Sequence, residues 1–315
     1  MTIPIIDLAT DDTARLADEL GTACRGPGFF YVVGHGIPSG QRAATFATAA
    51  EFFALPPAEK EKVAITGSPH NRGYVGFGTE TLDPAKPADL KEAFNVGLDL
   101  PADDPEVLAG KPFRGVNLWP DLPGFKDAML GWYGACWQVG RRVHRALAVD
   151  LGLDPAHFED KLDRPMATLR VLHYPPRPDS VQAGALGAGE HTDYGNLTLL
   201  ATDAVPGLEV RTRDGQWLRA PIVEDAFVCN IGDCLMRWTN EVYVSTPHRV
   251  VSPGGRDRMS IAFFLDPNPD AVVACLPGCS GPDRPPRYPP IAAVDYLRER
   301  LDATYAHRRR GEVTG

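Results

Sequence analysis

The 315-residue sequence lacks the long apolar run that a membrane-spanning helix requires, because no stretch reaches about 18 consecutive apolar residues. It also lacks an excess of positive charge: 32 Lys and Arg residues against 41 Asp and Glu residues give a net charge of −9. An acidic chain of this kind offers no basic surface for nucleic acid or for an anionic membrane. We therefore expect neither of them as a partner, and the sequence leaves open whether the protein is a monomer or a dimer.

Cysteine is scarce, with six residues in the chain. The six cysteines include no Cys-x-x-Cys pair, and no secretory leader is recognisable before them. For Cys275 and Cys279, a metal or redox pair is one interpretation, and two separate loop thiols are the favoured one. These features predict reduced thiols and a cytoplasmic location.

The remaining composition is that of a large folded unit. Hydrophobic residues make up 43% of the chain, enough to bury a substantial core. Residues 120–151 show the longest helical periodicity, whose apolar stripe we assign to the core. Many short strand patterns separated by turn residues indicate a sandwich or a closed barrel in the second half. These patterns lie at residues 168–174, 197–200, 208–210, 216–218, 227–231, 243–246 and 259–265.

The segment from Glu190 to Leu200 carries the strongest candidate for chemistry. His191 and Asp193 are two residues apart, so on a strand both side chains would point to one face and could reach one ion. His248, in another extended β-branched run, offers a second imidazole. Two histidines and one carboxylate on one side of a metal describe the facial triad of non-haem Fe(II) oxygenases. His35 is not assigned to the metal, since it lies between two glycines at a predicted strand end.

A second pair of polar residues follows ten positions after His248. Arg258 and Ser260 are two residues apart and share one face of a predicted strand. A guanidinium fork with a nearby hydroxyl suits a carboxylate. The pair would hold the far end of a dicarboxylic acid whose other end chelates the metal.

These motifs carry a resemblance to a known family. His191-Thr-Asp193, His248-Arg-Val and Arg258-Met-Ser260 resemble the metal and cosubstrate motifs of the 2-oxoglutarate and Fe(II)-dependent oxygenases, specifically the isopenicillin N synthase-like family. Further similar motifs in the same order make the match more specific than any one of them. They lie at residues 3–8, 27–38, 52–56, 59–62, 72–74, 89–94, 174–176, 230–235 and 237–243.

The resemblance implies a mostly β fold with flanking helices around a double-stranded β-helix, or jelly roll. It implies an N-terminal α/β segment at residues 1–115, the oxygenase core with its long helix at 116–275, and a connector and helix at 276–315. It also implies Fe(II), 2-oxoglutarate and O2 as cofactor and cosubstrates, and oxidation of a small molecule, with hydroxylation as the default. Tyr174 would lie near the cosubstrate, although the preceding Leu172-His173 departs from the Asn-Tyr of many plant members.

Other activities share these motifs. An oxidase of the isopenicillin N synthase type would use Fe(II) and O2 without an oxo acid, and an ethylene-forming enzyme would keep every motif. A non-enzymatic binding protein on the same fold is a remote alternative. A zinc hydrolase is weaker, since the ligand set favours iron.

Substrate contacts are predicted from position alone. The long irregular segment 66–89 favours a functional loop, with Tyr74 and Phe77 either facing substrate or packing beneath it. Arg170 would project inward from its strand or form a rim ion pair. Asn196 falls on the metal side by spacing. A helix at residues 291–310 would either close over the barrel mouth or pack outside it.

Overall fold

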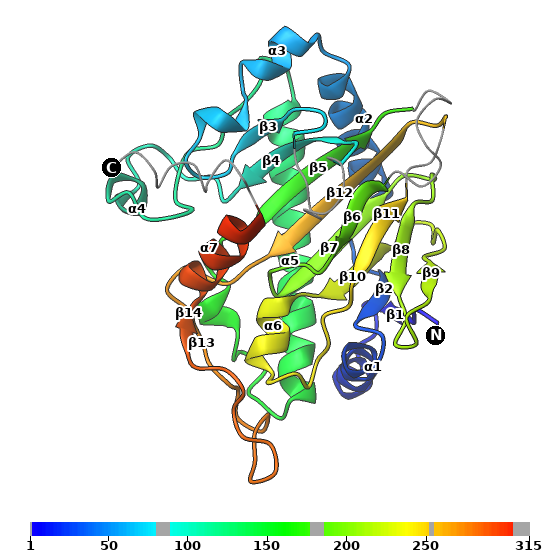
Figure 1. The fold of residues 1–315 in the computed structure, drawn as a ribbon, viewed down its shortest axis with the longest axis vertical. Coiled ribbons are helices and arrows are strands. Elements are labelled where there is room, and N and C mark those ends of the chain that lie inside the picture. The colour runs from blue at the N-terminus through cyan, green and yellow to red at the C-terminus, as the bar shows by residue number, and fades with distance from the viewer. Residues whose placement is uncertain (1, 80–88, 177–185, 252–254, 305–315) are drawn as a thin grey trace.

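Two β-sheets face each other in the computed structural model, which describes residues 2–79, 89–176, 186–251 and 255–304 (Figure 1). The larger sheet has eight strands among these residues, in the order β1 (Ile5–Asp7), β2 (Phe29–Val33), β10 (Phe227–Ile231), β7 (Leu197–Thr202), β12 (Arg258–Leu265), β5 (Thr168–Tyr174), β4 (Glu92–Gly97) and β3 (Gly73–Val75). The smaller sheet has the order β6 (Leu186–His191), β11 (His248–Val251), β8 (Leu208–Arg211) and β9 (Trp217–Arg219). A short pair, β13 (Val272–Val273) and β14 (Ile291–Ala292), lies apart.

Apolar side chains from both sheets meet between them, as the jelly-roll prediction requires. Ala188 and Val250 of the smaller sheet pack against Leu172 and Ala262 of the larger one. Alternate side chains of β7 and β12 point to opposite faces of the larger sheet. Each strand therefore contributes side chains both to the interior between the sheets and to the contact with the helices on the other face. The predicted jelly-roll core with flanking helices is confirmed.

Helix α5 (Phe125–Asp150) covers the other face of the larger sheet (Figure 1). Its apolar stripe is buried, with Met129 and Trp132 no more than 1% exposed, which confirms its assignment to the core. The predicted start at residue 120 is wrong, because Gly124 has a φ of 79° and residues 123–124 form a turn just before the helix. The other helices are α1 (Thr13–Arg25), α2 (Ser39–Phe53), α3 (Pro57–Glu61), α4 (Pro105–Leu108), α6 (Asp233–Trp238) and α7 (Ala293–Thr304).

Two further predictions of local structure are corrected. Residues 243–246 form no strand: Tyr243 is held by a hydrogen bond from its hydroxyl to Asp150, and Thr246 donates to the Pro27 carbonyl. The predicted C-terminal helix begins at Ala293 and not at residue 291, because Ile291–Ala292 form β14 and pair with β13. It is described to Thr304, and the predicted remainder lies outside the described residues. Within the described ranges, no helix is both long and apolar enough to cross a bilayer.

Behind the larger sheet, on the face away from the smaller one, lies a buried ionic network. Glu92 accepts hydrogen bonds from Lys60 (2.7 Å) and Tyr74 (2.6 Å) and pairs with Nδ1 of His173 at 2.7 Å. Nε2 of His173 contacts Asp257 at 2.7 Å. Burial alone would lower the pKa of His173, but the bonds to Glu92 and Asp257 outweigh it and leave the pKa raised.

This network gives the stability a defined pH dependence. Because the pKa of His173 is raised on folding, its contribution to the free energy of unfolding is complete below the usual pKa of 6.5. This contribution is lost as the pH rises through the pKa of His173 in the folded protein. We expect His173→Gln to lower the free energy of unfolding by about 1.5–3 kcal/mol at pH 6, the range for hydrogen bonds to charged groups. Denaturant unfolding at pH 6 and pH 9 measures this, and an equal loss at both pH values would contradict it.

Candidate active site

Three potential metal ligands converge between the two sheets. His191 ends β6 and His248 begins β11, and these two residues face each other in the antiparallel pairing, with ring centroids 4.4 Å apart. Oδ1 of Asp193 lies 3.8 Å from Nε2 of His191 and 3.6 Å from Nε2 of His248. Each residue offers one ligand atom, and the three atoms lie within 4.8 Å of one another. The structure therefore brings together the three residues that the sequence predicted as ligands.

The reason first given for their proximity is only partly correct. Asp193 does not share a strand face with His191, because β6 ends at His191 and Asp193 lies in the turn that leads to β7. That turn is fixed from outside by α6: the backbone N–H of Asp233 donates to the Asp193 carbonyl at 2.7 Å. Gly232 permits this close approach, since a Cβ there would collide with the Gly195 carbonyl.

Both imidazoles present the same nitrogen to the site. Nδ1 of His191 lies 2.7 Å from the Gly189 carbonyl, and Nδ1 of His248 lies 3.2 Å from the Thr246 carbonyl. A carbonyl only accepts, so each Nδ1 carries the proton and each Nε2 keeps a lone pair for an ion. Burial and the neighbouring His248 lower the pKa of His191 to about 4, which keeps its ring neutral.

The carboxylate of Asp193 is oriented by two donors. Its Oδ2 accepts from the Thr198 hydroxyl at 2.5 Å and from the Asn230 side-chain amide at 2.7 Å, so Oδ1 is left to face the imidazoles. Burial alone would raise the pKa of Asp193, but the two histidines and these hydrogen bonds outweigh it and lower the pKa. The carboxylate is thus held ionised, as a metal ligand must be. The sequence had flagged residues 230–235 as a motif without assigning this role to Asn230.

Thr198→Val should weaken metal binding while preserving the fold. The change keeps the side-chain shape and removes one of the two hydrogen bonds that orient Asp193. Loss of such outer-shell partners typically costs about 10- to 100-fold in metal affinity. Titration of the apo protein with Mn(II), followed by electron paramagnetic resonance, measures the dissociation constant. The matched control is Thr202→Val on the same strand, and equal affinities for the two variants would contradict the role of Thr198.

A cavity of about 190 Å³ opens beside the triad and is lined by both sheets. Its walls are mainly apolar and include Leu200, Val250 and Phe264. Leu297 and Leu301 of α7 also line it, so of the two predicted positions for the C-terminal helix, the one over the cavity is correct. Such a volume suits small molecules.

The buried guanidinium of Arg258 lines this cavity. Arg258 is 1% exposed, donates from Nε to the Val205 carbonyl at 3.2 Å, and places its Cζ 4.8 Å from the Tyr174 ring centroid. Its Nη1 is buried without a hydrogen-bond partner among the described residues. Ser260 follows on the same strand face and also lines the cavity. An unpartnered buried N–H of a cation fits a carboxylate ligand, and the residues present therefore suit a dicarboxylic oxo acid beside a metal.

Comparison with known proteins decides the family. Residues 3–122 match the model described as non-haem dioxygenase in morphine synthesis N-terminal, and residues 165–267 match the 2OG-Fe(II) oxygenase superfamily. The chain is 36% identical over 314 residues to the 2-oxoglutarate-Fe(II) type oxidoreductase hxnY of Emericella nidulans, covering 96% of this chain and 90% of that protein. The chain belongs to the 2OG-Fe(II) oxygenase superfamily.

Two further proteins are similar to this oxygenase over most of its length. Homoarginine-6-hydroxylase 2-ODD-233 of Oryza sativa subsp. japonica is 37% identical over 295 residues, covering 88% of this chain and 89% of that protein. The crystal structure of a full-length Neurospora crassa protein in complex with alpha-KG and thymine superposes with a TM-score of 0.85 at 35% identity, covering 96% of both chains. The oxygenase is a 2-oxoglutarate-dependent non-haem iron dioxygenase that uses Fe(II), 2-oxoglutarate and O2 and acts on a small molecule.

Of the four predicted substrate contacts, the structure places one on the cavity wall and three away from it. Arg170 lines the cavity from β5. Tyr74 does not: its ring packs among core aromatics such as Phe52, and its hydroxyl bonds Glu92 behind the sheet. Phe77 is 51% exposed and is not part of the described cavity wall. Asn196 is fully buried outside the cavity, with its amide 3.5 Å from Nε2 of His144, so its assignment to the pocket is corrected along with that of Tyr74.

Several polar residues on the cavity wall were not predicted. Asn95 lines the cavity from β4, and Lys91 lines it from the position just before β4. Lys91 forms an ion pair with the buried Asp89 at 2.6 Å. Asp266 follows β12 and is buried, and this burial together with the nearby Asp193 raises its pKa to about 8. Alternation along β12 from Arg258 and Ser260 would have placed Asp266 on the inner face.

Proposed function

We propose that this oxygenase hydroxylates a small organic substrate at a site where His191, Asp193 and His248 hold Fe(II), while Arg258 and Ser260 bind 2-oxoglutarate beside it. The convergence of the three ligand atoms within 4.8 Å of one another is the observation that carries the proposal. All three come from one side, which leaves the opposite positions of an ion facing the cavity. Tyr174 supports the cosubstrate by fixing the Arg258 guanidinium against its ring.

Each residue has a defined task in this scheme. When bound, iron would activate O2 as the oxidant, with two electrons supplied by the oxidative decarboxylation of 2-oxoglutarate to succinate and CO2 and two by the substrate. The Nδ1 hydrogen bonds fix the two imidazoles, and Thr198 and Asn230 fix the Asp193 carboxylate. The apolar wall excludes water from the reacting centre. Arg258 sets where the cosubstrate lies relative to the metal.

The principal alternative is an oxidase in which Arg258 and Ser260 grip the carboxylate of the substrate itself. The unpartnered Nη1 of Arg258 is compatible with both interpretations. The Neurospora structure, however, contains alpha-KG, and that neighbour covers 96% of this chain. This likeness favours an oxo acid at Arg258. The ethylene-forming interpretation is the weaker variant of the same site.

We propose Arg170 as a substrate contact, since its side chain lines the cavity on the strand next to β12 and opposite Ala262. The related proteins act on, or are crystallised with, compact nitrogen-containing molecules, namely homoarginine and thymine. A substrate of similar size, carrying a group that accepts hydrogen bonds from a guanidinium, would suit this wall.

The test is a screen for substrate-stimulated turnover. Anaerobically iron-loaded protein is mixed with 2-oxoglutarate and O2 in the presence of panels of amino acids, nucleobases and small acids. O2 uptake, succinate and oxidised product are measured together. We expect succinate and product in equal amounts for an accepted substrate. O2 consumption with no succinate would favour the oxidase interpretation, and no O2 uptake with any compound would reject the proposal.

A further inference from the structure

Asp266 is a buried carboxyl on the cavity wall. It is 8% exposed, and among the residues that the structure describes, no donor lies within hydrogen-bonding distance of its side chain. Other buried carboxylates are satisfied: Glu92 by Lys60, Asp89 by Lys91, and Asp193 by Thr198 and Asn230. Buried polar groups are almost always hydrogen-bonded, so an exception in a binding cavity needs an explanation.

The side chain of Asp266 lies close to the metal triad. Its Oδ1 packs directly on Gly195, two residues after Asp193, so closely that a Cβ at Gly195 would collide with it. Asp266 also follows Arg258 and Ser260 on the inner face of the same extended segment, at the end away from Arg258. A molecule bound between the triad and α7 would therefore meet Asp266 and not the cosubstrate anchor.

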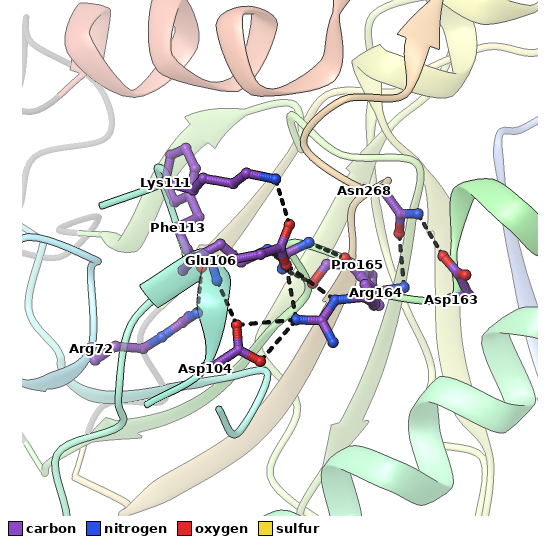
Figure 2. Close-up of polar contacts among 10 residues, drawn as sticks. Arg72, Asp104, Glu106, Lys111, Phe113, Asp163, Arg164, Pro165 and Asn268 are labelled. Carbon is purple, nitrogen blue, oxygen red and sulfur yellow. Dashed lines mark hydrogen bonds and ion pairs between the residues drawn. The ribbon is translucent and has the colours of Figure 1, made fainter. Parts of the chain in front are cut away.

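The segment after Asp266 is firmly held in place (Figure 2). The backbone N–H of Met166 donates to the Pro267 carbonyl at 3.1 Å, and the Asn268 side chain accepts from the Arg164 backbone N–H at 2.9 Å and donates to Asp163 at 2.6 Å. Arg164 in turn pairs with carboxylates at the start of α4, Asp104 at 3.1 Å and Glu106 at 2.9 Å.

The same region positions an aromatic wall residue. Phe113 lines the cavity with a φ of 57°, a left-handed conformation that is unfavourable for a bulky side chain. Its carbonyl accepts from Nη2 of the buried Arg72 at 3.2 Å (Figure 2). The next residue, Arg114, donates from Nη1 to the Pro165 carbonyl at 3.2 Å. Phe113 and Asp266 are thus both fixed to the 163–166 segment, and both face the cavity.

We propose that Asp266 binds a positively charged nitrogen of the substrate, such as an amidinium, guanidinium or ammonium group. The inference rests on the proposed function. Fe(II), Asp193 and a 2-oxoglutarate dianion sum to one negative charge, which Arg258 balances. Asp266 has no ion-pair partner among the described residues, and a cationic substrate would supply one and favour the ionised form of its carboxyl. The Phe113 ring offers an aromatic face to the same kind of group.

Binding of a simple aryl cation tests the proposal without requiring turnover. Benzamidine, benzamide and benzoate differ in charge but little in shape, and each is titrated into the full chain loaded with Mn(II) and 2-oxoglutarate, by calorimetry. We expect benzamidine to bind preferentially and Asp266→Asn to weaken it by at least about 30-fold, because truncating one partner of a buried charge pair costs this much or more. Asp270→Asn, which removes an exposed carboxylate from the same segment, is the matched control and should leave the affinity unchanged.

The outcomes separate this proposal from its rivals. Equal binding of benzamidine to the wild type and to Asp266→Asn, or preferential binding of benzamide or benzoate, would overturn it. The melting temperature gives a second measurement: a buried carboxyl that no structural contact requires predicts that Asp266→Asn melts at the same or a higher temperature, whereas a structural role predicts a lower one. Wild-type decarboxylation of 2-oxoglutarate, assayed separately, tests the oxygenase proposal independently of Asp266.

Discussion

His191→Ala and Asp193→Ala are each expected to abolish substrate oxidation, with a loss of at least about 100-fold. Each change removes one of three ligands to the ion, and even outer-shell partners of such ligands typically cost about 10- to 100-fold. Metal binding and succinate release should fall together, because the ion is the common requirement. Calorimetric Mn(II) titration and an assay for succinate measure the two losses on the same samples.

The control for these variants is His157→Ala. His157 is a half-buried histidine whose ring packs on Phe158, away from the cavity wall. It should retain metal binding and turnover. Ligand variants that keep full Mn(II) affinity would mean that the ion is held elsewhere, whereas lost activity with unchanged metal binding would assign the two residues a different role.

Arg258→Lys should raise the KM for 2-oxoglutarate by at least about 30-fold, with a smaller effect on kcat. Lysine keeps the positive charge but cannot present two parallel N–H donors to a carboxylate or stack on the Tyr174 ring. The fold-change is that expected when one partner of a buried charged hydrogen bond is altered. Succinate release as a function of 2-oxoglutarate concentration gives both constants.

Arg256→Lys is the matched control, because Arg256 is exposed and lies two residues before Arg258. Its KM for 2-oxoglutarate should equal that of the wild type. If Arg258→Lys left that KM unchanged but raised the substrate KM, the guanidinium would be gripping the substrate carboxylate, and the oxidase interpretation would gain support.

The sequence predicted the chemistry of the site better than its geometry. His191, Asp193 and His248 are identifiable because few ligand sets combine two imidazoles and a carboxylate in extended segments. Their approach, however, depends on the β6–β11 register and on a turn fixed by α6, and neither is encoded by a spacing of two residues. Strand alternation is a local rule, and Asp193 lies just past the end of the strand where that rule stops applying.

Residues whose roles depend on the packing of distant segments were the hardest to predict. Tyr74 has a side chain of the kind that often lines pockets, but it packs in the core. Its hydroxyl donates a hydrogen bond there to Glu92 on the neighbouring strand. Asn230 and Thr198 meet Asp193 only because β10 and β7 are adjacent. The helix and strand periods were enough to place α5 and β5, since those patterns reflect burial along a single element.

An anaerobic crystal structure with Mn(II) and 2-oxoglutarate is the most direct test of the central claim. The account predicts one ion bonded to Nε2 of His191, Oδ1 of Asp193 and Nε2 of His248, with the oxo acid chelating that ion and its distal carboxylate on Arg258. An ion bound away from these three atoms, or an oxo acid that does not reach Arg258, would contradict it.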